Sequence, residues 1–272
     1  MLILTSVFIL GVPVASQSLT RNLSKTVTVP FGAGGTLNLI GAPAGAVTIE
    51  GSNRQDVEIT AKIELTGSTE AELDRLAQVT SFAVEEGTAR MTIRSIGTHN
   101  RLGDKKFWKK FPKELLTRPF RIDYSLKVPF YLDLNISGGD GDLSLKGVEG
   151  TIRTTFARSD ARITLVGGTL NVAIDAGKLE LVFPERNWRS GMIEASVANG
   201  DITAKVPSAL NAELTAAIAG SGKIDNRLAS LKPRSANVPF TERSVIAKAG
   251  VGGPPVRFSV GSGNIELIPI EK

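Results

Sequence analysis

The segment from Arg101 to Arg121 holds eight basic side chains and four aromatic rings, a composition that can bind an anionic surface. Asp104 and Glu114 are its only acids, so eight positive charges against two negative give a net +6, while the whole chain carries +5. Such charges attract anionic lipids or glycans, and aromatic rings enter a lipid interface or stack on sugars. The candidate contact residues are Lys105, Lys106, Phe107, Trp108, Lys109, Lys110 and Phe111.

The same segment has a second interpretation, as a cap over one end of a β-sheet. In that case the rings close the core and the lysines stay solvated. Pro112 would break or begin a helix here. The two roles are compatible, and the sequence does not choose between them. No recognised nucleic-acid-binding module appears, so we do not expect nucleic acid as a physiological partner.

Carboxylates are the other candidates for chemistry, since they recur near turns of the chain. A carbohydrate-active enzyme would need two of them paired across a groove. Turn hydrogen bonding alone also favours Asp at such places, and no pair stands out. The run Gly138–Asp142 resembles a calcium-binding repeat only loosely, and turn chemistry explains it better. The residues concerned are Asp140, Asp142, Asp160, Asp175 and Asp201.

Cysteine and histidine counts exclude several classes of site. The chain has no cysteine, which removes disulfides, thiolate catalysis and cysteine-bound zinc. His99 is the single histidine, so sites that need two histidines are excluded, and we expect its position to be incidental. The sequence therefore predicts a non-enzymatic protein without a cofactor or metal.

The elements that must position these residues are strands, because the apolar residues alternate with polar ones along most of the chain. A helix is expected only at 69–79, where Thr69 and Glu72 form a capping box before an apolar face. Alternation with a period of two is typical of half-buried strands. It is clearest in the ranges Val57–Leu65, Tyr124–Val128, Leu132–Ile136, Leu170–Ile174 and Ala212–Ile218.

An internal repeat joins these strands: an apolar residue, a small turn, then the start of the next strand. The predicted strand starts lie at 143, 163, 179, 202, 224 and 265, and the last interval is close to two of the others. Repeats as long as the intervals between these strand starts stack on their neighbours to bury their apolar faces. We predict an all-β, solenoid-like (β-helical) stack, with a β-sandwich as the alternative. The copies are Ile40–Val47, Ile136–Leu143, Phe156–Ile163, Ile174–Leu179, Val197–Ile202, Ile218–Ile224 and Val260–Ile265.

The N-terminal sequence predicts a secretion signal. An apolar run, Leu2–Leu10, precedes small residues at Val14–Ser16, which suits cleavage after Ser16. No Lys or Arg precedes the run, which departs from the usual pattern. The expected organisation is a signal peptide at 1–16 and one repetitive β domain at 17–272, with the basic insert at about 98–121.

Several stretches resemble the bacterial putative-adhesin family, exported chains of repeated β-strands grouped as a domain of unknown function. The resemblance covers most of the chain after residue 25, apart from the insert. It implies a solenoid-like fold and an envelope or extracellular location, and no functional residue carries over from it. The stretches are Leu37–Ile40, Gly45–Gly51, Asp56–Ile59, Ser196–Ile202, Val206–Pro207, Asn211–Leu214, Gly252–Pro254 and Gly261–Ile265.

Three functional hypotheses follow for a protein of the periplasm, cell surface or extracellular space. The first is a binding or scaffolding module that contacts an anionic polysaccharide or lipid surface through the insert. The second is a purely structural envelope protein that acts through a protein partner or self-association. The third is a carbohydrate-active β-helix enzyme, which the dispersed carboxylates favour least.

Overall fold

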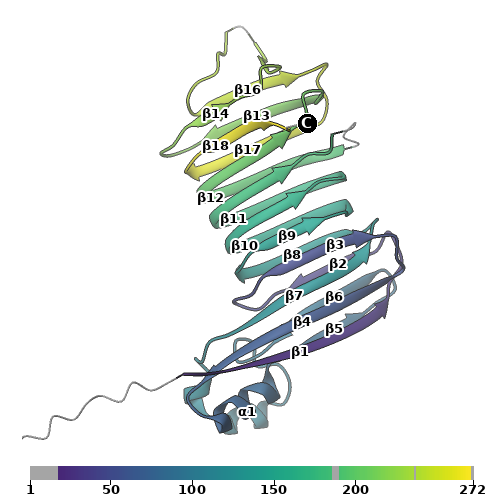
Figure 1. The fold of residues 1–272 in the computed structure, drawn as a ribbon, viewed down its shortest axis with the longest axis vertical. Helices are drawn as coiled ribbons and strands as arrows, with labels where there is room; N and C mark the ends of the chain where they lie inside the picture. The colour runs from purple at the N-terminus through teal and green to yellow at the C-terminus, as the bar shows by residue number, and fades with distance from the viewer. Residues whose placement is uncertain (1–17, 186–189, 236, 271–272) are drawn as a thin grey trace, which may run out of the picture.

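The structure is a computed structural model and describes residues 18–185, 190–235 and 237–270. Strands of this part of the chain join one 18-stranded mixed sheet (Figure 1). The prediction of an all-β protein is confirmed at this level. The signal peptide predicted at 1–16 lies outside the described residues. No helix among the described residues is long and apolar enough to cross a membrane.

The elements follow one another along the chain with short connections. The helices are α1 (Glu70–Val79), α2 (Lys105–Lys110) and the 3-10 helix η1 (Lys113–Leu115). The strands are β1 (Leu19–Pro30), β2 (Thr36–Ile40), β3 (Val47–Ser52), β4 (Asp56–Gly67), β5 (Ser81–Glu86), β6 (Arg90–Ile96), β7 (Phe120–Pro129), β8 (Asp133–Asp140), β9 (Leu143–Lys146), β10 (Glu149–Thr164), β11 (Gly167–Val182), β12 (Ser190–Val206), β13 (Ala212–Ile218), β14 (Ile224–Asn226), β15 (Lys232–Pro233), β16 (Ser244–Ala249), β17 (Pro255–Ser262) and β18 (Ile265–Pro269).

The middle of the molecule is a stack of parallel strands, in which β8, β10 and β11 have the same number of residues between facing positions. Leu134 faces Ile152 across β8 and β10, and Ile152 faces Leu170 across β10 and β11. These three residues are equally spaced along the chain. Each strand of the stack, here called a rung, therefore follows the previous one after one repeat length. β12 continues the stack, with Ile193 facing Leu170. Parallel pairing places like residues above one another, so each apolar position forms a column through the core.

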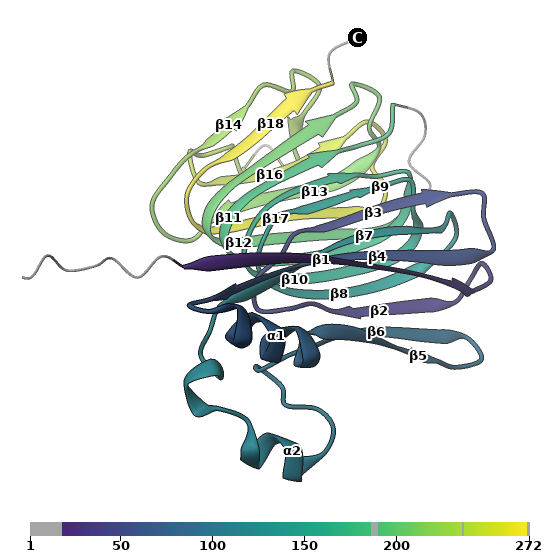
Figure 2. The ribbon, with the colours of Figure 1, turned by 60° about the horizontal axis from the view of Figure 1, so that its bottom comes forward.

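Each long strand bends once, and both of its arms face the same core. In β10 the buried positions run through Ile152, Thr154 and Phe156 before the bend, and through Ser159, Ala161 and Ile163 after it. Two successive exposed residues, Ala157 and Arg158, mark the bend. Figure 2 shows these strands curving around the interior. One rung of the stack thus contributes to two faces.

The sequence-predicted spacing of the rungs needs one correction. Leu143 and Leu179 both face Ala161, so the strand start after the bend of β10 is Ala161 and not Ile163. With Ile163 as the strand start, the numbers of residues to the preceding and following strand starts are unequal. Leu143, Ala161 and Leu179 are instead evenly spaced along the chain. Ala161 is 4% exposed. Its small side chain fills the core column but contributes a weak hydrophobic signal.

The order of the rungs in space also differs from their order in the chain. β17 and β18 lie between β12 and the pair β13 and β14, because Ile265 faces both Ile202 and Ile224. The long last step of the predicted repeat, from Ile224 to Ile265, is therefore a return into the stack and not two further units. At the other end, β2 and β3 likewise lie between β6 and β7 on one side and β8 and β9 on the other.

Antiparallel strands and α1 close the N-terminal end of the stack. β4 pairs antiparallel with β1 and β7, and β5 pairs antiparallel with β6. The helix predicted at 69–79 is confirmed as α1: Thr69 Oγ1 accepts the N–H of Glu72 at 3.2 Å, and Leu73, Leu76 and Val79 are buried. This end also carries the insert (Figure 2).

Candidate functional site

The insert folds as two short helical turns joined at Pro112. Asp104 caps α2, accepting the N–H of Lys106 at 2.8 Å. α2 ends at Lys110, and Pro112 precedes η1, which agrees with the helix break expected at this proline. Trp108 Nε1 donates a hydrogen bond to the carbonyl oxygen of Leu102 at 2.9 Å, which holds the loop before α2 against the helix.

Three of the predicted aromatic residues form one cluster. The Trp108 ring centroid lies 5.6 Å from that of Phe107 and 5.2 Å from that of Phe111. Phe111 is 7% exposed and Leu115 is 1% exposed, and both belong to the main core. Phe107 is 43% exposed and Leu102 is 45% exposed. The cluster therefore has a buried base and a solvent-facing apolar tip.

This geometry divides the seven candidate residues between the two predicted roles. Phe111 was predicted as a contact residue, but it is buried and anchors the insert, because the chain reverses from α2 into η1 directly over the core. Lys105, Lys106, Phe107, Lys109 and Lys110 are exposed, and Trp108 is half-buried. The insert is thus a cap at its base, while its outer side is free to contact a ligand.

The lysines of α2 take no part in the ion pairs of the described residues. Among the ion pairs in this part of the chain, none involves Lys105, Lys106, Lys109 or Lys110. By contrast, Arg118 is held by Glu72 at 3.1 Å and Arg121 by Asp123 at 2.9 Å at the base of the insert. The uncompensated charge is therefore concentrated around the exposed tip.

A shallow groove of about 480 Å³ crosses the insert beside these lysines. Its walls combine cationic side chains with the aromatic cluster, and no carboxylate of the described residues lines it. The lining residues are Arg101, Lys105, Trp108, Lys109, Phe111, Lys113 and Leu116.

His99 lies at the edge of the insert, as expected from the sequence. Its ring centroid is 5.4 Å from that of Phe120. Partial burial lowers the pKa of His99, so the imidazole is neutral at pH 7. It contributes no charge to the basic surface.

The carboxylates near the turns serve the backbone of the stack. Asp142 Oδ1 accepts the N–H of Asp160 at 3.3 Å, and Asp160 Oδ1 accepts that of Lys178 at 3.1 Å. Asp201 Oδ1 accepts the N–H of Asn264 at 2.8 Å in the same column. The sequence predicts hydrogen bonds within the turns for these residues, whereas each bond in the structure joins two neighbouring strands of the stack.

The other two aspartates lie beside this column. Asp140 pairs with Arg158 at 3.0 Å, and the backbone oxygen of Asp175 accepts from Asn199 at 3.4 Å. Across the part of the chain that the structure describes, no group of three or more His, Asp or Glu side chains is arranged to hold a metal ion.

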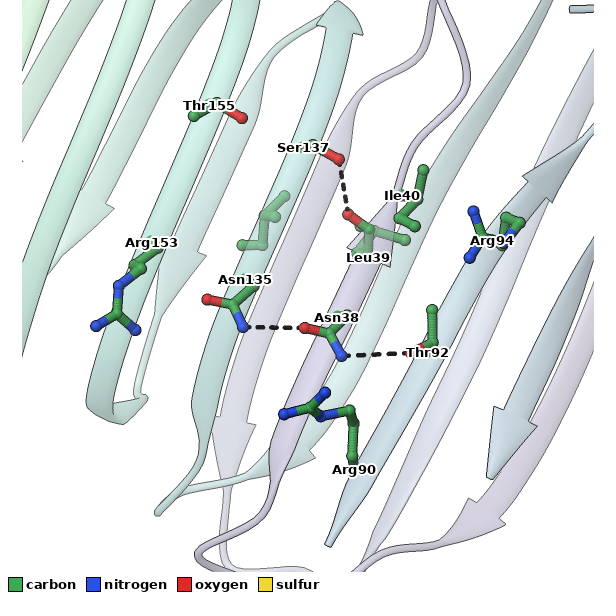
Figure 3. A pocket seen from close by; sticks show the side chains of 11 residues that line it. Asn38, Leu39, Ile40, Arg90, Thr92, Arg94, Asn135, Ser137, Arg153 and Thr155 are labelled. Atoms are coloured by element: carbon green, nitrogen blue, oxygen red, sulfur yellow. Dashed lines mark hydrogen bonds between the residues drawn. The ribbon is translucent and has the colours of Figure 1, made fainter. Parts of the chain in front are cut away.

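The structure has a second polar groove, which the sequence did not predict. It lies on the outer face of β6, β2, β8 and β10, where Asn38 and Asn135 are joined by a hydrogen bond and three arginines surround them (Figure 3). Its residues are spread from position 38 to position 155 of the chain. Only the strand register brings them together, so no local motif could have revealed them.

The comparisons with known proteins agree with the predicted resemblance. No family model and no curated protein matches the chain. A solved structure from Clostridium sporogenes, described as a "putative cell adhesion protein", is 14% identical and covers 92% of this chain and 100% of its own, with a TM-score of 0.49. A "putative adhesin" from Bacteroides fragilis is 14% identical over 91% of this chain and 97% of its own, with a TM-score of 0.30.

A "putative adhesin" from Parabacteroides distasonis is 10% identical, also over 91% and 97%, with a TM-score of 0.30. The resemblance to bacterial adhesin structures is thus confirmed over about nine-tenths of the chain.

Proposed function

We propose that this protein is an exported, non-enzymatic, adhesin-like β-solenoid of the cell envelope, which attaches to an anionic lipid surface through its basic insert. The observation that carries the proposal is the presence in the insert of two exposed apolar side chains, Leu102 and Phe107, together with the four lysines of α2, none of which forms an ion pair with a described residue. The rest of the chain acts as the scaffold that presents this tip.

The tip has the two features that interfacial binding requires. Each lysine near an anionic membrane surface contributes favourable charge attraction, and aromatic and leucine side chains then enter the boundary between headgroups and acyl chains. Neither feature alone gives stable attachment at physiological salt, because surface charges are screened within about 8 Å. Their combination on one short helix supports a lipid surface over a soluble glycan.

The solenoid part of the proposal rests on the strand register. Successive parallel pairings with one constant offset along the chain, and side-chain to backbone bonds between rungs, are what a stack of repeated coils requires. Such a stack is rigid along its length. It would hold the insert at one end and leave the remaining surface free.

The proposal is tested by co-sedimentation of residues 17–272 with vesicles of phosphatidylcholine containing phosphatidylglycerol, across a salt series. The variant Lys105→Gln/Lys106→Gln/Lys109→Gln/Lys110→Gln should bind on the order of a thousandfold more weakly, at about fivefold per lysine. The matched control changes four exposed lysines that also lack ion pairs with described residues and lie outside the insert: Lys178, Lys223, Lys232 and Lys248.

The control removes the same net charge, so it separates the insert from a general effect of charge. Equal weakening in both variants, or no binding of the unaltered protein to anionic vesicles, would contradict the proposal. The second outcome would favour a purely structural protein with a protein partner. Binding of acidic polysaccharide in place of vesicles by the same lysines would move the assignment to a glycan.

A further inference from the structure

The second groove has a volume of about 450 Å³ and lies on the flat outer face of four neighbouring strands. β2 and β8 form its floor, and β6 and β10 form its two sides. Its polar side chains point away from the core, because they alternate with the buried residues Leu37, Leu39 and Leu134. Figure 3 shows them on the same surface of the sheet, with Asn135, Asn38 and Thr92 in one row.

A row of amides and hydroxyls crosses the floor. Asn135 Nδ2 donates to Asn38 Oδ1 at 2.9 Å, and Asn38 Nδ2 donates to Thr92 Oγ1 at 3.3 Å. Each amide still has a second N–H, and the Thr92 hydroxyl still has its hydrogen to donate. The row is therefore held in place by its own bonds and retains donors and acceptors for a hydroxylated ligand.

Three arginines surround this row without acidic side chains among the described lining residues. Arg90 and Arg153 form no ion pair with any described residue, and Arg94 has a single, distant partner among them, Glu85, at 3.8 Å. Guanidinium groups offer fixed pairs of N–H donors that match carboxylate and sulfate oxygens. The groove is thus prepared for anionic groups.

A groove on the opposite face shows that this charge pattern is not general. It has a similar volume, about 430 Å³, and its lining includes Asp160, Glu180, Asp201 and Glu266. There Glu180 pairs with Arg162 at 3.2 Å and with Lys205 at 2.7 Å. Charges on that face compensate each other. By contrast, the groove lined by Arg90, Arg94 and Arg153, here called the arginine groove, has no acidic side chain among its described lining residues.

The spacing of the arginines indicates the size of that ligand. Arg90 and Arg153 lie on β6 and β10, which are three strand spacings apart, or about 14 Å. Arginines on strands this far apart suit a ligand that spans several strands. A chain of sugars with acidic groups can reach both, and its hydroxyls would lie over the amide row between them.

We infer that the arginine groove is a binding site for an acidic oligosaccharide, with carboxylate or sulfate groups at Arg90 and Arg153 and sugar hydroxyls at Asn38 and Asn135. The site is separate from the insert, and it goes beyond the proposed attachment to lipid. It would let one molecule hold a lipid surface and an acidic glycan at the same time.

Isothermal titration of residues 17–272 with oligogalacturonate and with sulfated heparin-derived oligosaccharides tests the inference. Arg90→Gln/Arg153→Gln should weaken binding by about a hundredfold, at about tenfold per charged hydrogen bond. Asn135→Asp changes the shape little but adds a negative charge, and it should abolish binding. Arg257→Gln, which alters an exposed arginine on the same face outside the groove, should bind as the unaltered protein does.

Neutral dextran and inorganic sulfate serve as the comparison ligands. The inference requires that dextran does not bind and that sulfate competes far more weakly than the oligosaccharides do. It is overturned if no acidic oligosaccharide binds, if Arg90→Gln/Arg153→Gln binds unchanged, or if free sulfate competes equally. Because the groove variants retain the α2 lysines, their vesicle binding should be unchanged, which separates this test from that of the proposed function.

Discussion

Replacing Gly200 with alanine tests the stacked corners on which the whole scaffold depends. The corner glycines Gly177, Gly200 and Gly263 have φ values of 131°, 141° and 138°, which residues with a Cβ rarely adopt. A Cβ on Gly200 would overlap the carbonyl oxygen of Gly177, and a Cβ on Gly263 would overlap that of Gly200. Each corner therefore packs backbone against backbone on the neighbouring rung.

The expected cost of Gly200→Ala is about 3–5 kcal/mol of unfolding free energy. Backbone strain accounts for about 1–3 kcal/mol, and displacement of the β11–β12 pairing at the corner accounts for the rest, at about 1 kcal/mol per hydrogen bond. For a chain of this size the thermal midpoint should fall by about 10 °C.

Circular dichroism melts of Gly200→Ala and of a control, Gly32→Ala, measure the difference. Gly32 has no described atom within 4 Å of an added Cβ and no positive φ, so its replacement should change stability by less than about 0.5 kcal/mol. Equal midpoints for the two variants would refute the stacked-corner account.

Three further predictions concern the core and the insert. Thr154 is 1% exposed and its hydroxyl has no partner among the described residues, so Thr154→Val should raise the free energy of unfolding by about 1 kcal/mol in denaturant titrations. Burial raises the pKa of Tyr124 to about 12, so up to about 3 kcal/mol of stability present below pH 10 should be lost between pH 10 and 12. In Tyr124→Phe that alkaline loss should be absent, although the 2.7 Å bond to Ser95 is lost at every pH. Leu115→Ala should cost about 2–4 kcal/mol, whereas Phe107→Ala should leave the thermal midpoint nearly unchanged; the reverse order would contradict the assignment of a buried base and an exposed tip.

Local patterns predicted the strands and the helix well, because each depends on residues that are neighbours in the chain. The internal repeat placed the strand that begins at Leu143, and the capping box placed α1. The core column that passes through Ala161, where the pattern had favoured Ile163, shows the limit of such patterns. A column position is defined by what lies above and below it in the stack, and a small residue there gives little local signal.

Features that depend on pairing between distant segments could not be predicted. The return of β17 and β18 into the stack places Ile265 between Ile202 and Ile224. All three are apolar residues of one core column, so the local pattern does not show which strands pair. The arginine groove has the same origin, since Asn38 and Asn135 are 97 residues apart. The insert was found because its charges are clustered in one short segment of the chain. Local charge density therefore revealed one candidate site and missed the other.

Quenching of Trp108 fluorescence by brominated lipids tests most directly whether the insert enters a membrane interface. The chain has two tryptophans, so a Trp188→Phe background leaves Trp108 as the only reporter. With anionic vesicles brominated near the headgroup end of the acyl chains, Trp108 emission should be quenched and shifted to shorter wavelength, and Lys105→Gln/Lys106→Gln/Lys109→Gln/Lys110→Gln should abolish both effects. Vesicle binding without quenching of Trp108, or no binding at all, would contradict the account.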